Sequence, residues 1–243
     1  MNWAQLRAFT SARVALGRAG SSLPTNELLE LQLAHARARD AVHAKLDTQA
    51  LALELKPISG ECFLVRSAAP DRPTYLRRPD LGRRLSVDSH RLLTKGKGQF
   101  DATFSIVDGL SALAVQRHAV RLFESVLDRL GSAHWKLAPV VLVEQGRVAI
   151  GDQVADCLGS TLSVVFIGER PGLSSPDSLG VYLTWNPRPG LTDANRNCIS
   201  NIRTEGLSYD AAARILLWLM TESRRRKLSG IRLREDTRAL EGP

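Results

Sequence analysis

The sequence predicts an α/β protein with a helical N-terminal part followed by a doubly wound, mainly parallel sheet. Two patterns predict this fold. Apolar residues recur at helical spacing over residues 25–46. From Phe100 onward, short β-rich runs alternate with helical patterns, which is typical of βαβ units with parallel strands. With 243 residues, of which 44% are hydrophobic, the chain has enough apolar material for a core.

Residues 1–56 are predicted to form a helical N-terminal domain. Residues 25–46 have the pattern of a long amphipathic helix, with Thr25 as its N-cap just after Pro24. We expect a second, shorter helix over residues 48–55 that ends before Pro57.

Residues 57–99 are predicted to be an irregular connecting segment, because they are rich in Pro, Gly and Arg. Within this segment, residues 62–67 have the pattern of a strand, and residues 70–85 are irregular or weakly helical. Ser86 is suited to cap a short helix over residues 87–95.

Residues 100–243 are predicted to form the second domain. The expected strands cover residues 100–109, 138–145, 161–169 and 181–187. The expected helices cover residues 111–131, ending at Gly131, residues 151–159, and residues 208–230, capped by Ser208. In doubly wound sheets, ligands bind where the carboxyl ends of the strands open. This rule points to residues 108–109, 144–147 and 168–170.

Arginine dominates the charge. The chain has 33 basic and 25 acidic residues, a net charge of +8, and 27 of its basic residues are Arg. A basic balance suggests nucleic acid or an anionic surface. Arg also favours bidentate pairing with carboxylates and phosphates at protein interfaces. The basic run at 224–227 has the pattern of a solvated helix C-terminus, and no aromatic residues interleave with it as in a nucleic-acid platform.

Several classes of protein are disfavoured. The longest apolar run, residues 137–143, is far shorter than the ~20 residues of a membrane span, and no signal peptide is predicted. The three cysteines lie far apart without a CxxC pair, which favours a reduced, cytosolic chain. Dinucleotide, phosphate-loop and serine-nucleophile motifs are absent, and the histidines have no metal-ligand spacing, so we expect no metal site.

Residues 167–203 are the most informative segment. They follow a buried strand but are crowded with Gly, Pro, Ser, Asp and Asn, and long irregular stretches in compact domains are usually functional. Glu169 and Arg170 are expected where the strand opens. Neutral groups suited to a ligand with amides and hydroxyls come from Asn195, Asn197, Ser200 and Asn201. A stiff loop that packs against a partner subunit explains the pattern equally well.

Four long motifs resemble the small (light) subunit of ethanolamine ammonia-lyase. They cover residues 9–43, 147–159, 168–185 and 192–203, and read FTSARVALGRAGSSLPTNELLELQLAHARARDAVH, RVAIGDQVADCLG, GERPGLSSPDSLGVYLTW and TDANRNCISNIR. The resemblance extends over nearly the whole chain, with the motifs in the right order. It is therefore far more specific than any short pattern.

The resemblance implies a lyase (EC 4.3.1.7) that converts ethanolamine to acetaldehyde and ammonia by adenosylcobalamin radical chemistry. It implies that the C-terminal domain is Rossmann-like and that a large TIM-barrel subunit holds the substrate, so we expect no catalytic residue in this chain. Cobalamin would lie between the two subunits, base-on, with its own dimethylbenzimidazole on cobalt. The family forms large hetero-oligomers of paired large and small subunits.

The same resemblance assigns three cofactor-binding residues: Val148 in GRVAIGD, Glu169 in IGERPGL and Cys198 in RNCISN. Val148 can supply an apolar or backbone contact. Glu169 can accept hydrogen bonds from corrin amides or a nucleotide hydroxyl. Cys198 is small enough for the ligand to approach closely. A buried packing thiol is the alternative for Cys198.

The resemblance changes the interpretation of the arginines. Those that fall inside the family motifs, rather than in a basic stripe, are Arg13, Arg18, Arg170, Arg196 and Arg203. We therefore expect interface chemistry, with their guanidinium groups meeting carboxylates of the larger partner, and no nucleic-acid partner.

Localisation and two alternative functions stay open. Many family members carry an N-terminal extension linked to packaging in a bacterial microcompartment, whereas this sequence begins almost directly with the helical motif, so a diffuse cytoplasmic enzyme is also expected. A nucleic-acid-binding module predicts affinity with a steep salt dependence. A stand-alone enzyme acting on a nucleotide predicts turnover by the isolated chain.

Overall fold

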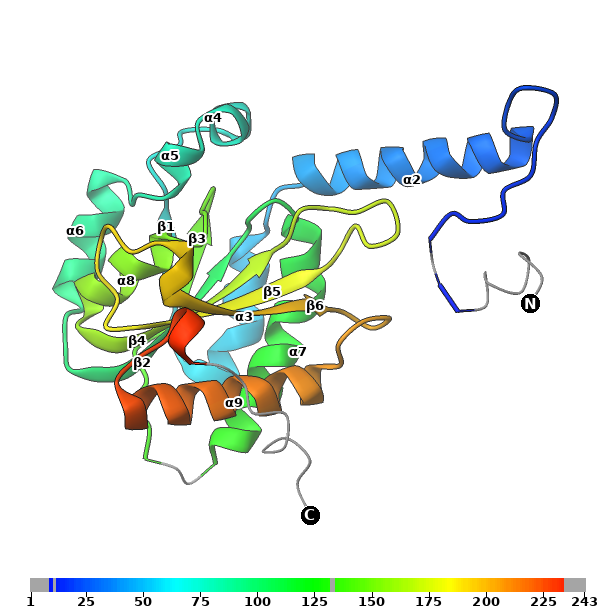
Figure 1. The fold of residues 1–243 in the computed structure, drawn as a ribbon. Helices are drawn as coiled ribbons and strands as arrows, with labels where there is room; N and C mark the ends of the chain where they lie inside the picture. Colours follow the sequence, from blue (N-terminus) through cyan, green and yellow to red (C-terminus); the bar gives the residue numbers. More distant parts are fainter. Residues whose placement is uncertain (1–8, 11, 132–133, 234–243) are drawn as a thin grey trace, which may run out of the picture.

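The computed structural model describes residues 9–10, 12–131 and 134–233, and these residues form a mixed α/β body around a six-stranded sheet (Figure 1). The strands are β1 (Phe63–Arg66), β2 (Phe100–Val107), β3 (Val141–Glu144), β4 (Ser160–Gly168), β5 (Leu179–Trp185) and β6 (Arg196–Ile202). In the order β1-β3-β2-β4-β5-β6, the first four strands pair in parallel, and β5 pairs antiparallel with both β4 and β6. The predicted α/β class and mainly parallel sheet are confirmed.

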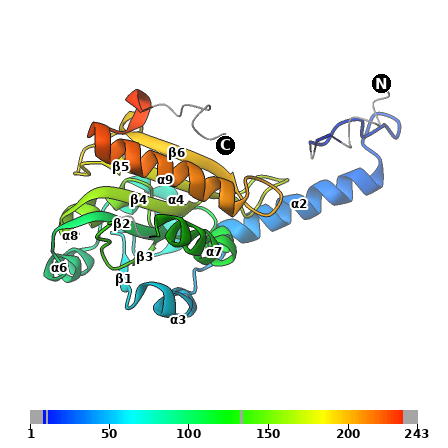
Figure 2. The ribbon, with the colours of Figure 1, turned by 90° about the horizontal axis from the view of Figure 1, so that it is seen from below.

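Helices lie on both faces of the sheet (Figures 1 and 2). The helices are α2 (Thr25–His43), α3 (Thr48–Ser59), α4 (Arg72–Arg77), α5 (Pro79–Gly82), α6 (Val87–Lys95), α7 (Ala112–Leu130), α8 (Ile150–Leu158) and α9 (Tyr209–Arg226), with 3-10 turns η1 (Asp193–Asn195) and η2 (Gly230–Arg232). One face packs against α3, α7 and α9, and the other against α6 and α8. The caps predicted at Ser86 and Ser208, and the helix end at Gly131, are confirmed.

The sheet separates two apolar layers. In the larger layer, the ring of Phe104 lies edge-on to Phe123 of α7 and Phe166 of β4, with centroid distances of 5.2 and 5.8 Å. The smaller layer lies beneath α6 and α8 and includes Ile150 and Val165. Val141, Leu142 and Val143 of β3 are buried on both faces of the sheet, which explains their unbroken apolar run, and Glu144 at the end of the strand is exposed.

Strand β6 corrects the prediction that most of residues 167–203 is irregular. Ile199 and Ile202 both reach the larger apolar layer, although residues three apart cannot share a face of a regular strand. Asn201 between them has a positive φ of 61°, and the register between β5 and β6 shifts. This irregularity breaks the alternating pattern on which strand prediction depends.

The N-terminal helices differ in detail from the prediction. Helix α3 continues through Pro57 to Ser59, because the proline lies in the last turn and frees only the carbonyl of the exposed residue Leu53. Helix α2 begins at Thr25, but Pro24 holds the N-cap position. The fully buried Leu51 of α3 packs in the larger apolar layer, and β1 pairs with β3. Helix α3 and strand β1 thus pack on, or pair with, the sheet that the later strands form.

Arg72, the first residue of α4, is buried where the carboxyl ends of β2 and β3 meet. Its Nε donates to the carbonyl of Val42 in α2 at 2.7 Å, and its Nη1 donates to the carbonyl of Gly109 at 2.8 Å. Nη1 also lies 3.4 Å from Oε1 of Gln145, which follows β3. One side chain therefore joins α2, α4 and two strand ends.

Asp108 at the end of β2 is the charged partner of Arg72, with its Oδ2 3.5 Å from Nη1. Its carboxylate accepts hydrogen bonds from the backbone N–H groups of Gln145 and Gly146 at 2.9 and 3.0 Å. Burial raises the pKa of Asp108 to about 6, although Arg72 and the two N–H groups act in the opposite direction. Removal of one member of such a pair leaves the other charge buried without compensation.

The substitution Arg72→Met should lower the free energy of unfolding by about 3–5 kcal/mol, because Asp108 would lose its buried cation. Urea denaturation at pH 7.5 measures this difference. Arg83→Met is the matched control, since Arg83 is exposed at the end of α5, and it should change stability by less than about 0.5 kcal/mol. Equal stability of the two variants would contradict the role of Arg72.

Candidate functional site

The carboxyl ends of β2 and β3 are the first place that the rule for doubly wound sheets indicated for a ligand. Side chains of the chain itself occupy this place. Arg72 lies there, and the guanidinium carbons of Arg72 and Arg147 lie over the ring of Tyr75, 4.7 and 4.3 Å from its centroid. The Tyr75 hydroxyl donates to the carbonyl of Gly146 at 3.0 Å. The third strand end that the rule indicated, at residues 168–170, lies toward β5 and β6.

Glu169 follows β4 directly, and its carboxylate reaches across β5 to β6. Oε1 accepts a hydrogen bond from the Ser200 hydroxyl, and Oε2 accepts from the Ser178 hydroxyl and, at 3.3 Å, from the backbone N–H of Asn201. The carboxylate passes over Gly180, where a Cβ would lie 2.9 Å from Oε1. The absence of a side chain at Gly180 therefore allows the carboxylate to lie against the sheet.

Cys198 of β6 lies beside this carboxylate. Its Sγ is 3.8 Å from the hydroxyl oxygen of Ser200, which itself donates to Glu169. Cys198 is opposite Tyr182 of β5, and Tyr182 is opposite Val165 of β4, so these residues share the sheet face on which α8 packs. Because Cys198 is exposed, the alternative of a buried packing thiol is wrong.

Val148 lies just before α8, half-buried, and packs on the smaller apolar layer, as does Tyr182. A buried ion pair between Asp152 in the first turn of α8 and Arg196 at the start of β6 braces these two elements. Burial raises the pKa of Asp152 to about 6, whereas Arg196 acts to lower it. The pair thus connects the helix after Val148 to the strand that carries Cys198.

This ion pair corrects one prediction about the arginines. Arg196 was expected to meet a carboxylate of the partner, but its side chain is buried and bound to Asp152 of the same chain. Its Nη1 also donates to the carbonyl of Thr192. Arg196 therefore stabilises the position of β6 rather than an interface.

The loop of residues 169–178 is held at both ends. Near its far end, Asp177 accepts a hydrogen bond from Arg117 of α7 at 2.7 Å, and the buried His118 lies 3.5 Å from the same oxygen. The Nδ1 of His118 is 2.7 Å from the hydroxyl of Tyr209 at the start of α9. Burial alone would raise the pKa of Asp177, but Arg117 and His118 lower it, so the carboxylate is charged at neutral pH.

Comparison with known proteins decides the family. The family model described as "Ethanolamine ammonia-lyase light chain (EutC)" matches residues 1–234. The chain belongs to this family.

Several relatives are more than half identical to this chain, and two of them illustrate the similarity. The relative from Azotobacter vinelandii is 56% identical over 238 residues, which cover 96% of this chain and 88% of the relative. The relative from Pseudomonas aeruginosa strain UCBPP-PA14 is 54% identical over 246 residues, which cover 99% and 90%. Both are named ethanolamine ammonia-lyase small subunit, and the resemblance stated from the sequence is confirmed.

Two of the polar residues that the sequence offered for ligand binding serve the fold of the light chain. The side chain of Asn197 accepts a hydrogen bond from the N–H of Gly230 at 2.7 Å. Asn195 accepts one from the N–H of Thr192 at 2.9 Å. Ser200, in contrast, contacts the candidate residue Glu169.

Sequence reasoning missed Ser178, Gly180 and Tyr182 as members of the light-chain site. They alternate along and just before β5 and line one face of the sheet beside Glu169 and Cys198. The period of two was visible in the sequence, within the motif GERPGLSSPDSLGVYLTW. This period places Ser178, Gly180 and Tyr182 in the site only once β5 is known to lie between β4 and β6.

Three further observations concern metal sites, membrane spans and the basic run at residues 224–227. Within residues 9–10, 12–131 and 134–233, no group of three or more His, Cys, Asp or Glu side chains could hold a metal ion. In the same residues, no helix combines the length and the apolar character of a membrane span. In the basic run, Arg225 and Arg226 bind Glu222, and Arg224 stacks 4.7 Å from the ring centroid of Trp135.

Proposed function

We propose that this light chain binds adenosylcobalamin at its boundary with the catalytic large subunit, within an enzyme that converts ethanolamine to acetaldehyde and ammonia (EC 4.3.1.7). One observation carries the proposal. Glu169 and Cys198, which the resemblance assigns to cobalamin, meet through Ser200 on one sheet face, although they come from different elements. Val148 lies just before α8, the braced helix, and packs on the apolar layer of the same face.

The chemistry of these residues fits a corrinoid, which is a large, mostly apolar ring with amide groups around its edge. Glu169 is oriented by three donors, and its carboxylate oxygens retain further lone pairs that can accept hydrogen bonds from amide N–H groups. Val148 and Tyr182 supply apolar contact area. The short side chain of Cys198 allows a flat ligand to approach β6. A few polar groups around apolar surface are typical of cofactor sites.

When bound, adenosylcobalamin supplies the radical that starts the reaction. The residues of this chain bind and orient the cofactor and exclude water from one side of it. We propose that the substrate and the catalytic residues lie on the large subunit, and that cobalamin keeps its own dimethylbenzimidazole as the lower base.

The assembly follows from the same proposal. Relatives named small subunit imply a larger partner, and we propose a higher-order hetero-oligomer of both chains in the cytoplasm, diffuse or inside a bacterial microcompartment. In this assembly, residues 100–243 act as a Rossmann-like cofactor domain. Nucleic acid is not part of the proposal, because Arg225 and Arg226 are bound to Glu222 of the chain itself.

Ethanolamine turnover should require both chains and adenosylcobalamin, because each chain forms only part of the cofactor site. Acetaldehyde release, followed with a coupled alcohol dehydrogenase, measures the activity of each purified chain and of the mixture. We expect activity in the mixture alone. Full activity of the large chain without this chain would refute the proposed function.

Glu169→Gln should raise the KM for adenosylcobalamin about tenfold or more in the assembled enzyme, with a smaller change in kcat, because a charge-assisted acceptor of cofactor hydrogen bonds is lost. Glu61→Gln is the matched control, since Glu61 lies on the surface before β1, at the amino ends of the parallel strands. Equal KM values for both variants and the unaltered enzyme would remove Glu169 from the cofactor site.

A further inference from the structure

Helix α2 projects from the body of the molecule, as Figures 1 and 2 show from two directions. It has 19 residues, and its buried side chains are only Ala34 and Ala41. Most helical stability in proteins comes from packing of an apolar face against the rest of the molecule. Two buried alanines supply little of this packing.

The part of α2 farthest from the body carries exposed leucines. The exposed fraction of the residue is 43% for Leu28, 58% for Leu29 and 51% for Leu33. Leu29 and Leu33 are four residues apart and thus adjacent on the helix surface. Scattered apolar residues on a surface are ordinary, but a cluster on one projecting helix is typical of an interaction site.

A contact with the rest of the molecule helps to set the direction of α2. The carbonyl of Val42, in its last turn, accepts a hydrogen bond from the buried Arg72 at 2.7 Å. The leucines are therefore presented at a defined place relative to the carboxyl ends of β2 and β3.

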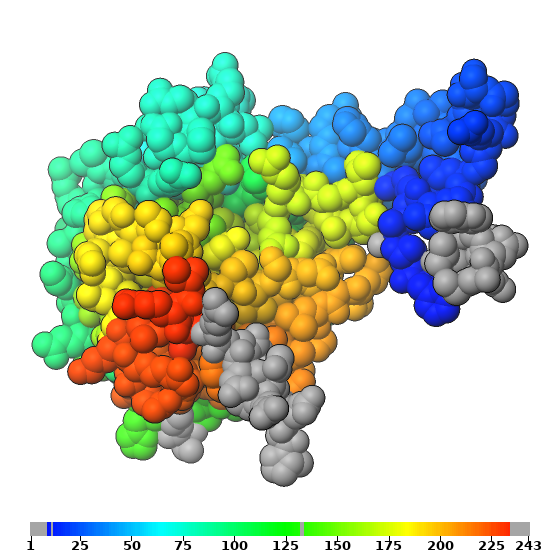
Figure 3. Space-filling view, in the orientation of Figure 1, coloured from blue at the N-terminus to red at the C-terminus, as the bar shows by residue number. Residues whose placement is uncertain are grey.

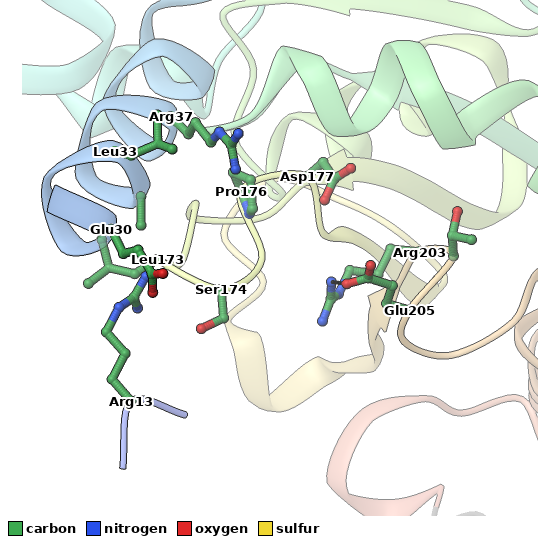
Figure 4. A pocket seen from close by; sticks show the side chains of 12 residues that line it. Arg13, Glu30, Leu33, Arg37, Leu173, Ser174, Pro176, Asp177, Arg203 and Glu205 are labelled. Atoms are coloured by element: carbon green, nitrogen blue, oxygen red, sulfur yellow. Dashed lines mark hydrogen bonds and ion pairs between the residues drawn. The ribbon is translucent and has the colours of Figure 1, made fainter. Parts of the chain in front are cut away.

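A cavity of about 560 Å³ lies beneath α2, between the helix and residues 173–177 and 203–205. Figure 4 shows Leu33 and Arg37 on the side of α2, with Leu173 and Pro176 opposite. The space-filling view shows the loop of residues 169–178 extending toward the helix (Figure 3). The cavity wall is thus partly apolar and carries charges of both signs, basic from Arg13, Arg37 and Arg203 and acidic from Glu30, Asp177 and Glu205.

This loop joins the two surfaces. It begins at Glu169, a proposed contact of cobalamin, and its exposed Leu173 lines the cavity beneath α2. A partner that covers the cofactor at Glu169 would lie next to α2 as well. The surface of α2 is therefore continuous with the proposed boundary between the subunits.

The charges near the cavity also indicate the kind of partner. Asp177 is bound by Arg117, and Glu205 lies 3.3 Å from Arg203. Among the described residues, Arg37 has no ion-pair partner. A second copy of this chain would bring a second net charge of +8 into a two-fold interface, which like-charge repulsion disfavours. A surface with carboxylates beside apolar residues fits better.

We propose that α2, through Leu28, Leu29 and Leu33 and with Arg37 beside them, is a docking element for the large subunit of the same enzyme. The partner surface is apolar and is flanked by carboxylates that pair with Arg37. This inference rests on the proposed function, because it takes the large subunit as the partner. It adds a second attachment, away from the cofactor, that holds the two chains together.

The test is the dissociation constant of the two separately purified chains, measured by biolayer interferometry. The double variant Leu29→Glu/Leu33→Glu should raise Kd at least tenfold, because it places charge on the apolar contact. Its thermal unfolding should match that of the unaltered chain, since both leucines are exposed. Arg37→Glu is a second, independent variant and should also weaken binding, with a smaller dependence on salt than the unaltered chain.

Leu53→Glu is the matched control, since Leu53 is 72% exposed on α3, and it should bind like the unaltered chain. Unchanged Kd for both α2 variants would overturn the docking role, as would an equal loss for the control. A dimer of the free chain in sedimentation velocity that the leucine substitutions dissociate would assign the surface to a second copy and also overturn it. Failure of the unaltered chain to bind the large subunit would instead refute the proposed function.

Discussion

The ion pair between Arg72 and Asp108 determines where several distant parts of the chain lie. The guanidinium group binds the carbonyl of Val42, 30 residues earlier, and that of Gly109, 37 residues later, while it neutralises a buried carboxylate. Because an unpaired charge there would be costly, α2, α4 and the ends of β2 and β3 keep one arrangement. Tyr75, whose ring contacts the guanidinium groups of both Arg72 and Arg147, extends this arrangement to the residue before Val148.

The elements that the sequence predicted are those with a local signal. Strands β2, β3 and β4 are largely buried and rich in apolar residues, and α7 and α9 carry recognisable caps or ends. Strand β6 has no such signal, because Asn, Ser and Arg fill it and Asn201 interrupts its alternation. The pairing of Arg72 with Asp108 was equally invisible, since no local pattern marks a contact between distant residues. The direction of β5 depended on the same kind of long-range information.

In the candidate site, too, some residues could be predicted from the sequence and others emerge only from the fold. Resemblance to a family supplied Val148, Glu169 and Cys198, and the rule for parallel sheets placed the first two at strand ends. Neither indicated that Ser200 would connect Glu169 to Cys198, or that Gly180 would leave room for the carboxylate. These contacts cross three strands, so they emerge only from the order β4-β5-β6. Asn197, attractive as a ligand-binding residue in the sequence, is bound to Gly230 instead.

The light chain thus presents a rigid sheet face and a projecting helix that one larger partner could cover together. The most direct measurement is a cryo-electron microscopy structure of both chains with hydroxocobalamin, which resembles the cofactor but starts no reaction. We expect the corrin ring at the boundary of the subunits, with Glu169 within about 3.2 Å of a corrinoid nitrogen or oxygen and Cys198 in contact with the ligand. A corrinoid enclosed by the large subunit alone, away from Glu169 and Cys198, would contradict cofactor binding by this chain.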